Sequence, residues 1–201
     1  MIISLDYKFI FIKTRKTAGS SIEKILLDKL KGTDYIFGGM EPEQMPPKNI
    51  SEFCEHRGHK WIRSNFGDRF KHFFKFAVER NPWDKTLSQW YWVKSLYPKK
   101  FKDFNQDLKN NNKALIVNDW KLYTRKDRID IDQVIKYENL HQDFKKICET
   151  INVEYNNELE TTRLKSTQRK IKSYKNVYTA ESLDIINIRY DKVIQEFEYK
   201  F

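Results

Sequence analysis

The chain has few cysteines and no long apolar run, and both absences narrow its class. Two cysteines, Cys54 and Cys148, in 201 residues are too few for a disulfide framework and do not point to an oxidising compartment. No run of about 18 apolar residues occurs, so we expect no transmembrane helix. Charges at Asp6, Lys8 and Lys13 interrupt the apolar segment that a signal peptide would need. We therefore expect a soluble, cytoplasmic protein.

Two common binding motifs are also missing. No Gly-x-x-x-x-Gly-Lys-Ser/Thr segment occurs, which excludes the usual P-loop. This absence, with the lack of an acidic strand end for Mg²⁺, disfavours a small-molecule kinase, which we keep as an alternative. Glu52, Glu55, His56 and His59 are neighbours in sequence, but their spacing is not that of His-Glu-x-x-His and no cysteine cluster accompanies them. We expect no bound metal.

The charge is strongly positive. There are 38 Lys and Arg residues against 28 Asp and Glu residues, which gives a net charge of +10 and favours an anionic partner. A hydrophobic content of 39% is enough for a folded core. Most aromatic residues fall at apolar positions of the expected helices and strands, where core packing explains them better than base stacking. A basic, non-catalytic nucleic-acid-binding protein is therefore a weaker alternative, and we expect no nucleic-acid partner.

Apolar runs and helical spacing predict strands that alternate with helices. The expected strands cover residues 8–12, 73–78 and 134–137. The expected helices cover residues 19–31, 51–66, 83–97, 139–151 and 179–197, and residues 105–113 read as a loop or frayed helix. This order predicts a single α/β domain over residues 1–201, with a central parallel sheet flanked by helices and a nucleotide-binding core like that of P-loop kinases.

One segment predicts a phosphate cradle. Residues 9–23 read as a buried strand, a short basic loop and the start of a helix, with Ser20 and Ser21 as expected cap residues. A helix N-terminus presents unpaired N–H groups and a partial positive charge to an anion. Lys16 precedes Gly19, so the lysine would reach the anion from the strand side of the loop. In a P-loop the lysine follows the glycines. The plainer alternative is a turn with solvated lysines.

A second segment repeats this pattern. A strand ends at Arg80, Asn81-Pro82 turns the chain, and a helix opens with proline in its first turn. Ser88 lies about two turns into that helix. Arg80 and Ser88 can hold one phosphate, the arginine through its planar fork and the serine through its hydroxyl. An ion-paired arginine and a solvent-facing serine are the alternative.

Together the two segments resemble the cofactor motifs of sulfotransferases that use 3′-phosphoadenosine 5′-phosphosulfate (PAPS). Lys16-Thr17-Ala18-Gly19-Ser20-Ser21 is similar to the first motif, and Arg80-Asn81-Pro82-Trp83-Asp84-Lys85 with Ser88 is similar to the second. The resemblance extends to residues 135–140 and 197–201 and is strongest to the membrane-free bacterial and viral relatives of carbohydrate O-sulfotransferases. Arg15 stands where the family usually has proline, and Ser20 where threonine is common.

The resemblance implies a role for each matching residue. Lys16 would contact the phosphosulfate and stabilise charge on the bridging oxygen, the loop backbone and serine hydroxyls would hold the 5′-phosphate, and Arg80 with Ser88 would hold the 3′-phosphate. A basic segment, residues 165–170, would close over that phosphate. The implied cofactor-binding set is Lys16, Thr17, Ala18, Gly19, Ser20, Ser21, Arg80, Ser88, Arg169 and Lys170.

Sulfuryl transfer also needs a base for the proton of the acceptor hydroxyl. Histidine suits this task because its pKa lies near neutral pH. His56 falls on the position of the base in this branch of the family, and His59, one helical turn away, is the alternative. Lysine and arginine can supply the positive charge, so no metal is required. The acceptor implied by the branch is a hydroxyl of a carbohydrate or small metabolite.

Overall fold

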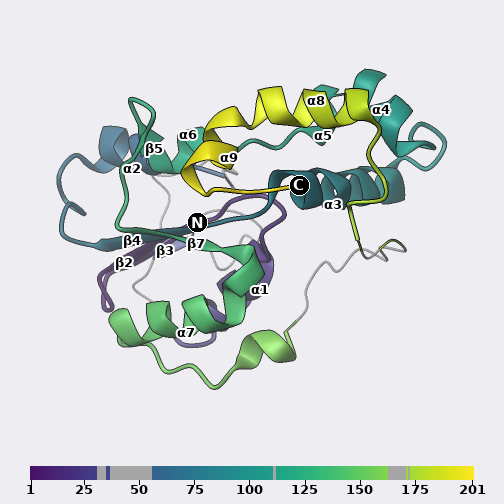
Figure 1. Ribbon diagram of the computed structural model, residues 1–201. Helices are drawn as coiled ribbons and strands as arrows, with labels where there is room; N and C mark the ends of the chain where they lie inside the picture. The colour runs from purple at the N-terminus through teal and green to yellow at the C-terminus, as the bar shows by residue number, and fades with distance from the viewer. Residues whose placement is uncertain (31–34, 37–55, 111, 163–170, 172) are drawn as a thin grey trace. The chain divides into compact units, whose positions relative to one another are not determined.

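The structure, a computed structural model, describes residues 1–30, 35–36, 56–110, 112–162, 171 and 173–201 (Figure 1). The chain forms two compact units. The sheet unit comprises Met1–Glu79 and Lys121–Leu164, and the helical unit comprises Arg80–Trp120 and Lys165–Phe201. The prediction of one domain over residues 1–201 stays a prediction.

A five-stranded sheet in the order β3-β1-β2-β4-β7 forms the centre of the sheet unit. Its strands are β1 (Ile2–Ser4), β2 (Phe9–Ile12), β3 (Tyr35–Ile36), β4 (Phe74–Glu79) and β7 (Gln133–Lys136). The pairs β2·β4 and β4·β7 are parallel, which confirms the predicted parallel core of an α/β fold. β1 runs antiparallel to both β2 and β3. β1 and β3, which the sequence did not predict, extend the sheet beyond β2 with β3 at the edge.

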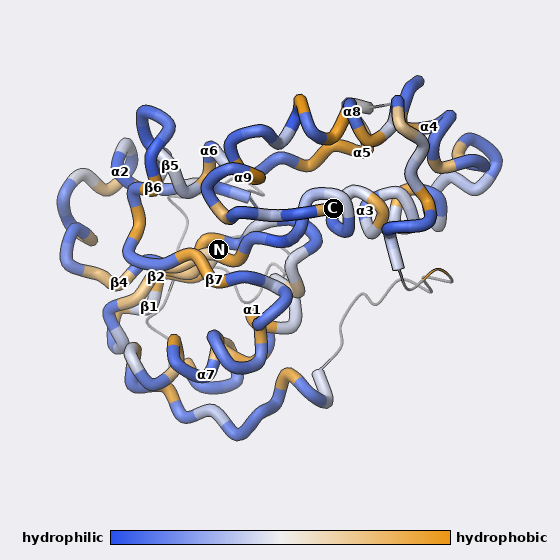
Figure 2. Tube along the Cα trace, viewed as in Figure 1, coloured by the Kyte–Doolittle hydropathy of each residue, from blue (hydrophilic) through white to orange (hydrophobic). Residues whose placement is uncertain are grey.

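Continuous apolar runs explain why the central strands form. All four residues of β2 are fully buried, as expected for a parallel strand covered on both faces. Orange, apolar segments mark β2 and β4 in Figure 2, whereas α7 alternates between orange and blue. The rings of Phe11 and Phe76, on neighbouring strands, stack with centroids 5.1 Å apart. Cross-strand aromatic contacts of this kind hold the two strands in register.

Helices α1 (Gly19–Leu27) and α7 (Leu140–Thr150) pack on the same face of the sheet (Figure 1). They confirm the helices predicted over residues 19–31 and 139–151, although α1 ends earlier. Their apolar stripes enter one core with the strands, formed by Ile22, Ile25, Leu26, Leu140, Phe144, Ile147, Phe11, Phe76 and Val78. Cys148 lies in this core, where burial raises the pKa of its thiol to about 12, so the side chain acts as a small apolar group.

Shorter elements complete the sheet unit. They are α2 (His59–Phe66), the hairpin β5 (Thr124–Arg125) and β6 (Arg128–Ile129), and the 3₁₀ turns η2 (Tyr137–Asn139) and η3 (Glu158–Glu160). The short helix α6 (Trp120–Tyr123) begins at the last residue of a helical-unit segment and continues into the sheet unit. The helix predicted over 51–66 is confirmed from His59 and wrong over residues 56–58, which are not helical, and residues 51–55 lie outside the described part. Gly58 precedes it, and a Cβ there would lie 2.5 Å from the Leu122 backbone.

The helical unit consists of α3 (Pro82–Leu96), α4 (Phe104–Asn110), α5 (Asn112–Leu115), α8 (Ala180–Arg189) and α9 (Asp191–Glu196). The helix predicted over 83–97 is confirmed, the one over 179–197 is divided at Tyr190, and residues 105–110 are helical. Tyr190 is fully buried and its hydroxyl accepts a bond from the N–H of Val117 (2.9 Å). Among the residues described, no helix is long and apolar enough to cross a membrane.

Candidate functional site

The loop between β2 and α1 has an unusual backbone. Lys16 and Ala18 have φ angles of 62° and 60°, in the left-handed region that residues other than glycine seldom adopt. Ala18 is the N-cap of α1, so the prediction that Ser20 and Ser21 cap the helix is wrong; both lie inside its first turn. Alanine has no side-chain oxygen with which to bind the first N–H groups of the helix. The loop therefore turns tightly and leads into a helix N-terminus without a capping side chain.

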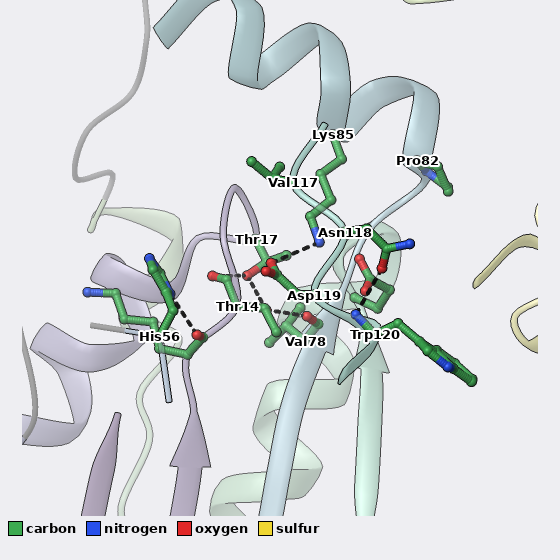
Figure 3. Close-up of polar contacts among 12 residues, drawn as sticks. Thr14, Thr17, His56, Val78, Pro82, Lys85, Val117, Asn118, Asp119 and Trp120 are labelled. Atoms are coloured by element: carbon green, nitrogen blue, oxygen red, sulfur yellow. Dashed lines mark hydrogen bonds and ion pairs between the residues drawn. The ribbon is translucent and has the colours of Figure 1, made fainter. Parts of the chain in front are cut away.

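Buried hydroxyl groups attach this loop to the neighbouring strand (Figure 3). The hydroxyl of Thr14 donates to the carbonyl oxygen of Val78 in β4 (2.5 Å) and lies 2.8 Å from the hydroxyl of Thr17. Thr17 in turn donates to the carbonyl oxygen of Thr14 (3.0 Å). The hydroxyl of Thr17 is thus bonded within the loop. The contact with an anion that the sequence predicts for Thr17 would therefore be made by its backbone N–H group.

A buried ion pair spans the base of the same loop. Nζ of Lys13 lies 2.6 Å from Oε2 of Glu23 on α1, and both side chains are almost completely buried. A Cβ on Gly19 would lie 2.8 Å from Cγ of Lys13 and 3.3 Å from the carbonyl oxygen of Thr14, which explains the glycine. Lys13 therefore anchors the loop. Sequence reasoning missed Glu23, because an acidic residue within an amphipathic helix carries no distinctive signal.

His56 lies beside this loop, 43 residues away in sequence from the residue that it contacts. Its Nδ1 is 2.9 Å from the carbonyl oxygen of Lys13 (Figure 3). A carbonyl oxygen can only accept, so Nδ1 carries the hydrogen and the neutral ring keeps its lone pair on Nε2. The bond fixes the tautomer and attaches the ring to the end of β2.

His59, the alternative base, has a different neighbour. Its Nδ1 lies 3.0 Å from Oδ2 of Asp130, a carboxylate that also receives two bonds from Arg125 (2.7 and 3.2 Å). Burial lowers the pKa of His59, although the carboxylate of Asp130 acts in the opposite direction. The ring is therefore neutral at pH 7 and is held toward the segment between β6 and β7.

The second predicted segment opens α3 in the helical unit. The side chain of Asn81 accepts from the N–H of Asp84 (3.1 Å) and caps the helix, and Pro82 is its first residue. The amide of Asn81 also donates to the hydroxyl of Tyr174 (3.1 Å). The predicted helix start at Asn81-Pro82 is confirmed, with a complete side-chain cap that α1 does not have.

Arg80 and Ser88 are both buried in the structure. Nε and Nη2 of Arg80 donate to Oδ2 of Asp84 (2.8 and 2.5 Å). Asp84 and Ser88 are four residues apart on α3, so they share one face of the helix. Arg80 is thus ion-paired, as one reading of the sequence expected, whereas Ser88 is not solvent-facing.

A fully buried ion pair fixes α3 within the helical unit. Nζ of Lys85 lies 3.2 Å from Oδ2 of Asp119, and neither side chain is exposed (Figure 3). Removing one partner of such a pair leaves an uncompensated charge in the interior. Lys85 therefore has a structural role within the second motif, and Asp119 has no sequence signal of its own.

Arg169 and Lys170 lie outside the described residues. The part of the chain that the structure describes contains no group of three or more histidine, cysteine or acidic side chains placed to hold a metal ion.

One comparison with known proteins identifies a family, and another identifies a similar fold. The model of the sulfotransferase family matches residues 1–200. The fold is similar to that of mouse sulfotransferase SULT7A1 complexed with PAP, with a TM-score of 0.55 and 13% sequence identity over 96% of this chain and 86% of the mouse chain. At this identity the likeness supports the fold alone. A comparison with curated protein sequences finds no match.

Proposed function

The chain belongs to the sulfotransferase family, and we propose that it transfers a sulfuryl group from PAPS to the hydroxyl of an acceptor. The observation that carries the choice of donor is the start of α1. A left-handed turn at Lys16 and Ala18 leads into a helix whose N-cap has no capping side chain. A helix N-terminus of this kind suits an anionic phosphate. The mouse sulfotransferase of similar fold was complexed with PAP, and our proposal extends a donor of this kind to the present chain.

The 5′ end of the donor would be held by the loop and the first turn of α1. Backbone N–H groups from Thr17 to Ser21, Ala18 and Gly19 included, would bind the 5′-phosphate with the hydroxyls of Ser20 and Ser21. Glu23 supports this role indirectly, because it holds Lys13 and thereby the base of the loop. Lys16 would place its charge at the bond that breaks.

The 3′-phosphate would be held by Arg80 and Ser88. The guanidinium of Arg80 is planar and suits bidentate contact with an oxyanion. In the structure its fork is directed at the carboxylate of Asp84, so a bound phosphate would compete with Asp84 for the same donors. Arg169 and Lys170 are proposed to add charge to the same phosphate.

The reaction needs charge stabilisation and removal of one proton. When bound, the donor supplies an activated sulfuryl group whose bond to the phosphate oxygen breaks as the acceptor oxygen attacks. Lys16 would stabilise the negative charge that develops on the departing phosphate oxygen. His56 would take the hydroxyl proton on Nε2, the nitrogen left with a lone pair by its contact to Lys13.

The acceptor is proposed to be a hydroxyl of a carbohydrate or small metabolite. This choice is supported only by the branch of the family that the motifs resemble. Incubation of the protein with labelled PAPS and a panel of sugars, phenols and lipids would identify the class. Transfer to a phenol or lipid and to no sugar or other small metabolite would contradict the proposal.

A titration tests the donor. We expect 3′-phosphoadenosine 5′-phosphate to bind more tightly than ATP, and a single-stranded oligonucleotide to bind weakly. A small-molecule kinase would prefer ATP with Mg²⁺, and a nucleic-acid-binding protein would prefer the oligonucleotide. Equal affinity for the bisphosphate and ATP would contradict the proposed donor.

A further inference from the structure

The sheet unit contains a pocket that none of the proposed roles uses. It has a volume of about 430 Å³, within the range of small-ligand sites. Helix α2, the turn that follows it, the start of β4 and the segment between β6 and β7 form its walls. Ile62, Phe70, Ile129 and Ile131 give the pocket an apolar side, and the remaining lining residues are charged apart from Gly67 and His59.

The pocket lies at the opposite end of the sheet from the phosphate loop. Lys75, one of its lining residues, is the second residue of β4, whereas the loop contacts β4 at Val78. Three residues of an extended strand span about 10 Å. A ligand in this pocket is therefore separate from the proposed donor site.

The carboxylates of two lining residues are already compensated. Asp130 receives two bonds from Arg125 and one contact from His59. Asp132 accepts from the backbone N–H of Lys75 (2.8 Å), and its Oδ2 lies 3.9 Å from the Lys75 ammonium. These negative charges do not repel an incoming anion as unpaired carboxylates would.

Two of the cationic side chains that line the pocket form no ion pair within the described residues. Within the described part of the chain, Arg63 and Lys71 have no carboxylate partner, although both line the pocket. The backbone of Lys71 is held in place because its carbonyl oxygen accepts a hydrogen bond from the Lys75 ammonium (3.0 Å). Among the lining carboxylates, Asp68 alone has no cationic partner within the same described residues. The uncompensated charge at the pocket is thus two positive against one negative.

His59 adds a neutral acceptor to this wall. Asp130 can only accept from Nδ1, so the lone pair of the neutral ring is on Nε2. Nε2 has no partner among the described residues. A hydroxyl group of a ligand can donate to it while an acidic group of the same ligand meets Arg63.

We propose that this pocket binds a small anion that carries both an acidic group and hydroxyl groups, such as a sugar acid or a hydroxy acid. Arg63 and Lys71 contact the acidic group, the first through its planar fork and the second as a point charge. Nε2 of His59 accepts from a hydroxyl. The apolar wall faces the carbon skeleton.

Titration of the whole chain with glucuronate, lactate and glucose tests this site. We expect at least one of the two acids to bind about tenfold or more tightly than glucose, as expected when one charge-assisted hydrogen bond is gained. Glucuronate and lactate distinguish a sugar acid from a simple hydroxy acid. If both acids bind no better than glucose, the proposal is wrong.

Two variants locate the binding. Arg63→Ala should weaken binding of the acid about tenfold, whereas Lys60→Ala should leave it unchanged, because Lys60 is an exposed cation on the same helix outside the pocket. Binding of 3′-phosphoadenosine 5′-phosphate should be unchanged in both variants, which also shows that they fold. Equal losses in both variants would indicate general charge attraction, and competition between acid and bisphosphate would place the acid in the donor site; either result overturns the proposal.

Discussion

The two segments that resemble cofactor motifs begin their helices in opposite ways. Helix α1 has Ala18 at its N-cap, and alanine has no side-chain oxygen with which to bind the first N–H groups. Helix α3 has Asn81, which binds the N–H of Asp84, followed by Pro82, which has no N–H to offer. In the proposed function the first segment would thus present backbone to the ligand, and the second the side chain of Arg80.

This difference separates a preformed site from an adjustable one. The first loop is fixed by buried hydroxyl bonds and by the pair of Lys13 and Glu23. Arg80 instead pairs with the carboxylate of Asp84, and in the proposed function a 3′-phosphate would replace that carboxylate. Substitutions in the first segment should therefore act on geometry and chemistry, and substitutions in the second on ligand choice.

Lys16→Ala should give the largest effect. Loss of a charge placed at the developing negative charge typically lowers kcat about 10²- to 10³-fold. Binding of 3′-phosphoadenosine 5′-phosphate should weaken far less, because the backbone cradle remains. Lys24→Ala, which removes an exposed charge from α1, the helix that follows the loop, is the matched control for rate measurements with labelled PAPS. A fully active Lys16→Ala enzyme would refute the assignment.

Arg80→Ala should remove the preference for a 3′-phosphate. A hydrogen bond to a charged group contributes about 1.5–3 kcal/mol, so the ratio of affinities for the bisphosphate and adenosine 5′-phosphate should fall at least about tenfold. Arg80→Lys should keep part of this ratio, because it retains charge and loses the planar fork. Calorimetric titration of both nucleotides gives the ratio. An equal loss for both would show that Arg80 does not distinguish them.

Asn81→Ala should destabilise the protein by about 1 kcal/mol, the usual contribution of an N-cap. The corresponding change in the first segment, Ser20→Ala, should alter the free energy of unfolding by less than about 0.5 kcal/mol, because Ser20 lies inside α1 and does not cap it. Urea unfolding of both variants measures the contrast. Equal losses would remove the distinction between the two helix starts.

Acidification should change the free energy of unfolding least of all. The change should arise in the sheet unit, which holds all four histidines. Burial lowers the pKa of His59 despite Asp130, with Lys75 and Arg125 also lowering it. The unfolded chain then binds more protons, so the free energy of unfolding should be highest above pH 6.5 and decline as the pH falls below it toward the lower pKa of the folded state. His59→Gln should flatten this part of a urea-unfolding profile between pH 5 and 7. An unchanged profile would contradict the inference.

Much of the fold follows from local sequence patterns. The apolar runs of β2 and β4 identify buried strands, the Val134-Ile135 pair identifies β7, of which only Ile135 is buried, and helical spacing identifies α1, α3 and α7. The three-residue strand β1 was missed because so short a run carries no periodicity. The β5–β6 hairpin was missed because its turn, Lys126-Asp127, adopts positive φ angles without the usual Asn-Gly or Asp-Gly signal.

The site is less predictable because its contacts join distant residues. The left-handed conformation of Ala18 follows from the whole loop and not from a residue preference, so the serines after it were taken for caps. His59 and Asp130 are far apart in sequence, and only the packing of α2 beside β6 brings them together. A pocket built from such contacts has no signal in one sequence.

Gly58 lies between His56 and His59, the two predicted bases, and its Cα faces the backbone of Leu122 closely. Any side chain at position 58 would require the Leu122 backbone to move, since a Cβ would come within 2.5 Å of it. A library that varies the residues around His56 and His59 to change the acceptor should therefore keep this glycine constant. Variants with another residue at position 58 would misfold, so a screen for a new acceptor would not recover them.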